Sequence, residues 1–414
     1  MKQFNVFTVL IVMMSIMAVF TTFNMLLSGQ SIQQQAQSAQ SAQSAQPAQP
    51  VQSTQSKQPM QPVKPEKTKP LIQLAILLDT SNSMDGLIEQ AKTQLWKIVN
   101  EMALAKQNGV NPRLEVALYE YGNDGLPASE NFLRLIVPLS EDLDRISEEL
   151  FKLKTNGGSE FCGTVIQSAT DSLKWSKNNN DLKAIFIAGN EPFTQGQIDY
   201  KNSCKKAITN GIIVNTIFCG NFQEGVNTSW KDGADLADGK YMNIDSNQVI
   251  VQVSAPQDKE IIELGKKLNE TYVGYGATGG VAKKRQMEQD ANAASLNESV
   301  MAQRAMTKSS AQYANSSWDL IDAEKEGKVD VEKLDEKSLP EEMKKMKPEE
   351  RKQYIETKKK ERTDIQSKIN RLREERDKYV AEQRKKESGE KTLDQAMIEA
   401  IRTQAEKKNF KFEK

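Results

Sequence analysis

Histidine is absent from this chain of 414 residues, and its absence argues against two common kinds of active site. Histidine is the usual general base near neutral pH and the commonest zinc ligand in proteins. Without it a Ser-His-Asp hydrolase triad is excluded and zinc catalysis is disfavoured. No paired carboxylates at a defined spacing offer an alternative acid and base. We therefore expect a protein that is not an enzyme.

Net charge is also absent, because 56 basic residues balance 56 acidic ones. A neutral chain has no overall field to draw it onto nucleic acid or anionic lipid. No zinc-ligand spacing and no glycine-rich phosphate loop stand out either. The sequence does not predict a nucleic-acid-binding protein.

Charge is missing altogether from the long apolar run of residues 4–27. As a helix this run would span a hydrocarbon core of roughly 30 Å, which suits an uncleaved anchor. A signal peptide is the alternative, although no clear cleavage site follows. Residues 1–29 are thus expected to be a signal peptide or an N-terminal membrane anchor. The rest of the chain is expected to lie outside the cytoplasm, in the periplasm or cell envelope, attached to the inner membrane if the segment is retained.

Residues 30–70 are mostly Gln, Ser, Ala and Pro, and they are predicted to form a disordered tether. In residues 71–270 short β-branched runs alternate with amphipathic stretches, the pattern of a doubly wound α/β domain with a mostly parallel sheet. The predicted strands are 71–79, 113–121, 132–139, 183–189, 212–220 and 240–245.

Two helices of this domain can be placed from local signals. Apolar residues recur every three or four positions from Leu87 to Ala105, which predicts one helix closed by Gly109. Ser140 precedes an acidic amphipathic stretch and is predicted to be its N-cap.

Residues 277–414 are rich in Lys, Glu and Gln and are predicted to form a charged, α-helical extension, an arm outside the core. Ile365, Ile369, Leu372 and Tyr379 fall at coiled-coil spacing over two to three heptads. This stripe predicts a partly coiled-coil segment that self-associates or docks a partner. A solvated helix laced with ion pairs is the alternative.

The stretch "LAILLDTSNSM" places Asp79 at the end of the first predicted strand, with Ser81 and Ser83 at every second residue after it. In a parallel sheet, ligands bind beyond the carboxyl ends of the strands. A carboxylate and two hydroxyls leaving a strand tip can direct oxygens into one space, which is what a hard cation such as Mg²⁺ requires. The spacing therefore indicates a cation-binding loop.

With these residues in place, the segment 71–255 resembles the von Willebrand factor A domain family, a Rossmann-like fold. The D-x-S-x-S motif of that family's metal-ion-dependent adhesion site matches "DTSNS", and its Trp, helix, Gly, strand ending matches "WKDGADLADGKYMNID". The resemblance implies a bound divalent cation, Mg²⁺ or alternatively Mn²⁺ or Ca²⁺. It also implies a protein partner whose carboxylate completes the metal shell.

The resemblance extends to two further loops, with one departure. It implies that Ser159 binds the metal or a water on it, with Thr164 as a substitute; a helix-capping role for Ser159 is the alternative. Where the family's fourth strand usually ends in Asp, this chain has Gly189, followed by Asn190 and Glu191. Asn190 could hold a water and Glu191 could supply a carboxylate.

The three cysteines are Cys162, Cys204 and Cys219, so at least one thiol is unpaired within the chain or bridges to another molecule. If Gly211 joins the helix of Cys204 to the strand of Cys219, their heights differ by roughly 14 Å. Bridged Cα atoms lie within about 7 Å, so that pairing is disfavoured. Cys162 and Cys219 are the better candidates for a disulfide, and three buried thiols are the alternative.

Two functions remain open. The first is a non-enzymatic, metal-dependent, adhesion-type protein-binding module of the cell envelope. The second is a structural envelope scaffold with a degenerate metal site, which acts through the helical extension and self-associates or docks a partner there.

Overall fold

The computed structural model describes residues 69–245, 252–384 and 393–412. The predicted signal or anchor, and the tether up to residue 68, lie outside these residues. Within the described part of the chain, none of the helices combines the length and the apolar character that a membrane crossing requires.

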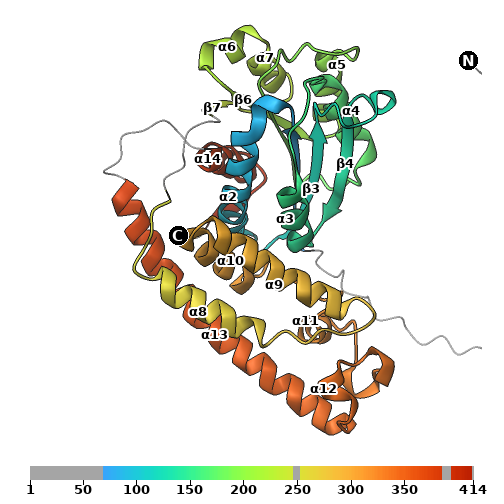
Figure 1. The fold of residues 1–414 in the computed structure, drawn as a ribbon, viewed down its shortest axis with the longest axis vertical. Coiled ribbons are helices and arrows are strands. Elements are labelled where there is room, and N and C mark those ends of the chain that lie inside the picture. Colours follow the sequence, from blue (N-terminus) through green and yellow to red (C-terminus); the bar gives the residue numbers. More distant parts are fainter. Residues whose placement is uncertain (1–68, 246–251, 385–392, 413–414) are drawn as a thin grey trace, which may run out of the picture. The chain divides into compact units, whose positions relative to one another are not determined.

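A six-stranded sheet in the order β4-β3-β1-β5-β6-β7 forms the centre of the domain (Figure 1). All neighbouring strands are parallel except β3 and β4, which are antiparallel. The strands are β1 (Leu71–Asp79), β3 (Arg113–Tyr121), β4 (Leu133–Ser140), β5 (Leu182–Gly189), β6 (Ile213–Cys219) and β7 (Tyr241–Ile244). The doubly wound α/β prediction is confirmed, and each strand end lies within one residue of its predicted position. Strands covered on both faces are continuous apolar runs, which makes them easy to recognise.

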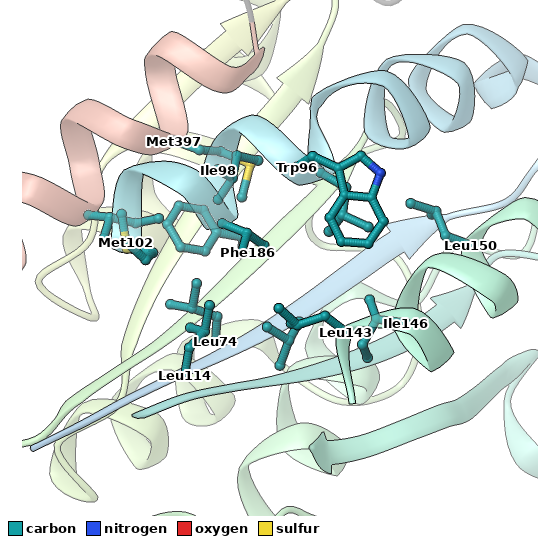
Figure 2. Close-up of a cluster of buried hydrophobic side chains, with 14 of the residues drawn as sticks. Leu74, Trp96, Ile98, Met102, Leu114, Leu143, Ile146, Leu150, Phe186 and Met397 are labelled. Carbon is teal, nitrogen blue, oxygen red and sulfur yellow. The ribbon is translucent and has the colours of Figure 1, made fainter. Parts of the chain in front are cut away.

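Helices cover both faces of this sheet. One face packs against α2 and α3, and Figure 2 shows side chains of these helices meeting strand residues such as Leu74, Leu114 and Phe186. The opposite face packs against α4, α5 and α7. The helices of the domain are α2 (Asp85–Met102), α3 (Leu143–Lys152), α4 (Cys162–Ser172), α5 (Tyr200–Thr209), α6 (Phe222–Asn227) and α7 (Trp230–Asp235). Two 3-10 turns, η1 (Asn82–Met84) and η2 (Ala128–Glu130), precede α2 and β4.

Two of the local predictions were wrong in detail. The helix that was predicted to continue to Gly109 ends at Met102, because the chain turns into a short strand, β2 (Ala105–Gln107). This strand pairs antiparallel with β8 (Phe410–Phe412), a partner more than 300 residues away that no local pattern reveals. The N-cap of α3 is Asp142, whose side chain accepts a hydrogen bond from the Arg145 amide, and not Ser140.

A mostly helical region follows residue 252; its first helix, α8, lies inside the predicted α/β segment 71–270, and the later helices lie in the predicted extension 277–414. Its helices are α8 (Asp258–Asn269), α9 (Gly279–Leu296), α10 (Glu298–Ser309), α11 (Leu320–Lys325), α12 (Glu341–Lys344), α13 (Pro348–Arg384) and α14 (Leu393–Glu406), with 3-10 turns η3 (Val331–Lys333) and η4 (Glu336–Ser338).

This extension is not an arm outside the core, which corrects the sequence-based expectation. Ala305 of α10, Ile369 of α13 and Ile401 of α14 are fully buried in the same apolar cluster as Leu74 of β1. Helices α10 and α14 both pack on α2 (Figure 1). The region is highly charged, but its few apolar residues face the α/β domain and are buried against it. Its low apolar content therefore did not predict its burial.

The apolar stripe of α13 packs within the chain. Arg362 of α13 bonds to Thr271, just beyond the C-terminal end of α8, whereas Arg376 bonds to Asp258 at the start of α8. Helices α8 and α13 therefore run antiparallel, side by side (Figure 1). Ile369 and Leu372 are buried within the chain, and this intramolecular contact accounts for the coiled-coil spacing.

Candidate metal centre

The predicted cation loop lies where the strand order of the sheet reverses. Strand β1 is flanked by β3 on one side and by β5 on the other, and Asp79 ends β1 while Gly189 ends β5. Ligands of doubly wound sheets bind in the crevice at this switch point.

The first loop turns its three predicted oxygen donors toward one another. The Ser81 amide donates to Asp79 Oδ1 at 2.7 Å, which folds the loop back over the strand end. The hydroxyls of Ser81 and Ser83 lie 3.1 Å apart. Asp79 and Ser81 are buried and Ser83 is exposed, so the three donors lead from the sheet edge to the surface.

The second loop lies against the first through backbone hydrogen bonds. The Asn156 amide donates to the Thr80 carbonyl at 2.9 Å, and the Asn82 amide donates to the Gly157 carbonyl at 3.0 Å. Ser159, half-buried, follows on this loop. It is not the N-cap of α4, which is Phe161, and Thr164 lies inside that helix.

Glu160 is a site residue that sequence reasoning missed. Its side chain is 2% exposed and lies beside the side chains of Asp79 and Ser81. The Glu160 amide donates to Gln195 Oε1 at 2.6 Å, which holds the loop in place. In the sequence only its position next to Ser159 pointed to the site. An acidic residue just before a helix is more often a solvent-exposed side chain that interacts with the helix N-terminus.

The third loop contributes an amide side chain and backbone atoms. Asn190 Nδ2 lies 3.2 Å from the Ser83 hydroxyl, so the structure brings this predicted residue to the first loop. Glu191 contacts the site through its backbone, since its amide donates to Glu160 Oε2 at 3.4 Å. Its carbonyl accepts a hydrogen bond of 2.8 Å from the indole of buried Trp230, which anchors the loop.

Tyr121 explains why glycine ends β5. Its hydroxyl donates to the Ala188 carbonyl at 2.9 Å. A Cβ atom on Gly189 would lie 2.6 Å from this hydroxyl and 3.1 Å from Asp79 Oδ2. The space beside Asp79 is therefore filled from β3, a contact that the sequence alone did not indicate.

The two carboxyl groups of the site are buried together without a counter-charge. Burial raises the pKa of Asp79 well above its ordinary value, and the neighbouring Glu160 raises it further. Burial also raises the pKa of Glu160. Among the described residues neither carboxyl joins an ion pair, and Asp79 Oδ2 receives no hydrogen bond. Two buried carboxylates and two hydroxyls suit a hard divalent cation.

Carboxylates and hydroxyls, with the Asn190 side chain, are the donors of the site. In the described ranges, no group of three or more His, Cys, Asp or Glu side chains is arranged to hold a metal ion. A cation here would depend on Asp79 and Glu160 together with the serine oxygens.

The predicted Cys162–Cys219 disulfide is not formed, and all three cysteines are free, buried thiols. Cys162 packs on the sheet face that carries α4 and α5, whereas Cys219 packs on the α2 face. The sheet separates the two sulfur atoms. Burial raises the pKa of each thiol, that of Cys204 to about 12, so none is a reactive thiolate near neutral pH.

Replacing Gly189 with Ala is expected to lower the free energy of unfolding by about 1–3 kcal/mol, because the new methyl group overlaps the Tyr121 hydroxyl. In a Tyr121→Phe background the same change should cost less, since the clashing atom is gone. Denaturant unfolding of the four proteins measures this coupling. Gly158→Ala, where no atom lies within 4 Å of the added Cβ, is the matched control. Equal costs in both backgrounds would show that the hydroxyl does not exclude a side chain.

Part of the chain is similar to known proteins. Residues 73–235 match the family profile of the von Willebrand factor type A domain. No curated protein matches the chain.

Several solved structures are similar. BatB from Bacteroides thetaiotaomicron has 17% identity and a TM-score of 0.32, over 42% of this chain and 90% of that one. An aerotolerance-related membrane protein from Bacteroides fragilis has 17% identity and a TM-score of 0.29, over 42% and 93%. Proximal thread matrix protein 1 from the mussel byssus, solved with zinc in its MIDAS motif, has 11% identity and a TM-score of 0.33, over 44% and 43%, so this chain spans less than half of that protein.

The family profile covers the strands from β1 to β6 and all three loops of the site. Residues 73–235 of this chain are therefore a von Willebrand factor type A domain, which the chain continues into a helical extension.

Proposed function

We propose that this chain is a non-enzymatic protein-binding module of the cell envelope that depends on a divalent cation. The observation that carries the proposal is the convergence of Asp79, Ser81 and Ser83 on one space, with Asp79 Oδ2 buried and without a donor. Ser159 and Asn190 lie on the adjoining loops and are the further predicted donors. The backbone of Glu191 holds the third loop, since its amide donates to Glu160 and its carbonyl accepts from Trp230.

A hard cation bound here, Mg²⁺ or alternatively Mn²⁺ or Ca²⁺, would attract an anionic group from outside. The chain's own residues hold the donors in place and bury one side of the site, while exposed Ser83 marks the open side. A carboxylate of a protein partner fits that position, as in adhesion-type domains of this family. The uncharged apolar segment of residues 4–27 supports an envelope location.

Self-association through the helical extension is less well supported. Ile369 and Leu372 of the predicted interaction stripe are buried within the chain's own core. A scaffold that used this stripe would have to unpack α13 from α8.

Replacing Asp79 with Ala is expected to abolish cation binding and the cation-dependent recovery of a partner. The purified full chain is titrated with Mn²⁺ and followed by electron paramagnetic resonance, and pull-downs are compared in Mg²⁺ and in chelator. Asp235→Ala, at an exposed carboxylate that pairs with Lys231, is the matched control and should behave as the unmodified chain does. Mn²⁺ binding that survives in Asp79→Ala would refute the proposed site.

A further inference from the structure

The third loop of the site has lost a carboxylate that the family usually supplies. Gly189 stands at that position, and the Tyr121 hydroxyl lies 2.6 Å from where its Cβ would be. An acidic side chain cannot be placed there unless Tyr121 moves. If the site binds a divalent cation, a second negative charge has to come from elsewhere.

Glu160 reaches the site from the second loop. A Cβ atom built on Gly122 would lie 2.7 Å from both Asp79 Oδ1 and Glu160 Cγ, so the two acidic side chains flank the same glycine. Gly122 has φ +77, a conformation that side chains rarely adopt, and its bare Cα leaves them room. The carboxyl of Glu160 also contacts the Ser81 side chain.

The position of Glu160 is built by its surroundings. Gln195 Oε1 accepts from its amide at 2.6 Å, and the Glu191 amide of the third loop donates to its Oε2 at 3.4 Å. The side chain is 2% exposed, which is unusual for a glutamate that pairs with no cation among the described residues. Asp79 Oδ2, the other oxygen of the neighbouring carboxyl, has no hydrogen-bond donor within the described part of the chain. Two carboxylates cannot satisfy each other, so a cation or a shared proton must lie between them.

We infer that Glu160 is the second carboxylate ligand of the divalent cation and replaces, from the second loop, the charge that Gly189 lacks. This inference rests on the proposed function. With Asp79 and Glu160 the site holds two negative charges against the two positive charges of the cation. The cation and its two carboxylates together carry no net charge when an anionic partner binds. The same balance would hold if the second carboxylate came from the third loop.

The test compares Mn²⁺ binding by the full chain and its variants, measured by electron paramagnetic resonance and by the rise in unfolding temperature with added MgCl₂. Glu160→Gln keeps the shape and removes the charge. It is expected to weaken Mn²⁺ binding by about 100-fold or more, because even residues that only support a ligand contribute 10–100-fold. Glu263→Gln, the same change at an exposed glutamate of α8 outside the site, is the matched control and should bind as the unmodified chain does.

A second variant tests whether the charge can be moved back. Tyr121→Phe with Gly189→Asp clears the hydroxyl and returns the acid to the third loop. Added to Glu160→Gln, this pair of changes should restore Mn²⁺ binding to within about tenfold of the unmodified chain. Continued weak binding in that triple variant would contradict the replacement of one carboxylate by the other.

The outcomes separate this inference from the proposed function. Unchanged Mn²⁺ binding in Glu160→Gln, together with its loss in Asp79→Ala, overturns the role of Glu160 and leaves the cation site standing. Absence of Mn²⁺ binding in the unmodified chain, with a higher unfolding temperature in Glu160→Gln, shows that the pair shares a proton and overturns both.

Discussion

Replacing Arg304 with Met is expected to lower the free energy of unfolding by about 3–5 kcal/mol. Arg304 of α10 is fully buried and pairs with Asp144 of α3 at 2.6 Å and with Asp290 of α9 at 3.0 Å. Its guanidinium also stacks on Trp96 of α2, 4.4 Å from the ring centroid. Methionine keeps the apolar contact and leaves Asp144 without its cation inside the protein.

The burial of these charges sets the size of this effect. An exposed ion pair contributes about 0–1 kcal/mol, whereas removing one partner of a buried pair leaves an uncompensated charge in a medium that solvates it poorly. Lys308 still neutralises Asp290, so the loss falls mainly on Asp144. Denaturant unfolding followed by circular dichroism measures the change.

Arg371→Met, at an exposed arginine of α13, is the control and should change stability by about 0.5 kcal/mol or less. If Arg304→Met costs no more than this control, the extension is not held to the domain by the buried cluster.

Replacing Ile401 with Ala is expected to cost about 2–5 kcal/mol, because its side chain is fully buried and the cavity left behind cannot collapse completely. Ile401 lies on α14, which packs on α2 next to the sheet. Met397 of the same helix reaches the core drawn in Figure 2. We therefore expect the substitution to destabilise the sheet domain and the extension together, so that both unfold in a single transition.

Thr403→Ala, two residues away on the exposed side of α14, is the matched control for helix propensity. Unfolding is followed by far-ultraviolet circular dichroism for the helices and by tryptophan fluorescence for the core. In Ile401→Ala the circular dichroism signal could fall at a lower denaturant concentration while the tryptophan fluorescence transition stays where it is in the unmodified chain. That result would show that α14 unfolds independently of the sheet domain.

The sheet was predictable because its information is local. The central strands are mostly apolar and β-branched, and Asp79, Ser81 and Ser83 lie within five residues of one another. Their chemistry can be recognised without knowing what else is near. The resemblance to the family rested on the same local pattern, and the family profile confirms it.

The rest of the site was not predictable because its members meet only in three dimensions. Tyr121 comes beside Asp79 through the pairing of β1 with β3, and Glu160 arrives from a loop some 80 positions later. Nothing around Glu160 in the sequence distinguishes a buried carboxylate from a solvated one. The environment that raises its pKa is assembled from three separate loops.

The amino-acid order by itself determined the α/β class, the strand positions and the first loop of the site, since these depend on periodicity and on close neighbours. Tertiary structure alone decided that the charged extension belongs to the core and that a glutamate faces Asp79. The burial of the extension and of Glu160 depends on which surfaces pack together and exclude water. Those contacts join residues far apart in the chain, so the local sequence does not contain them.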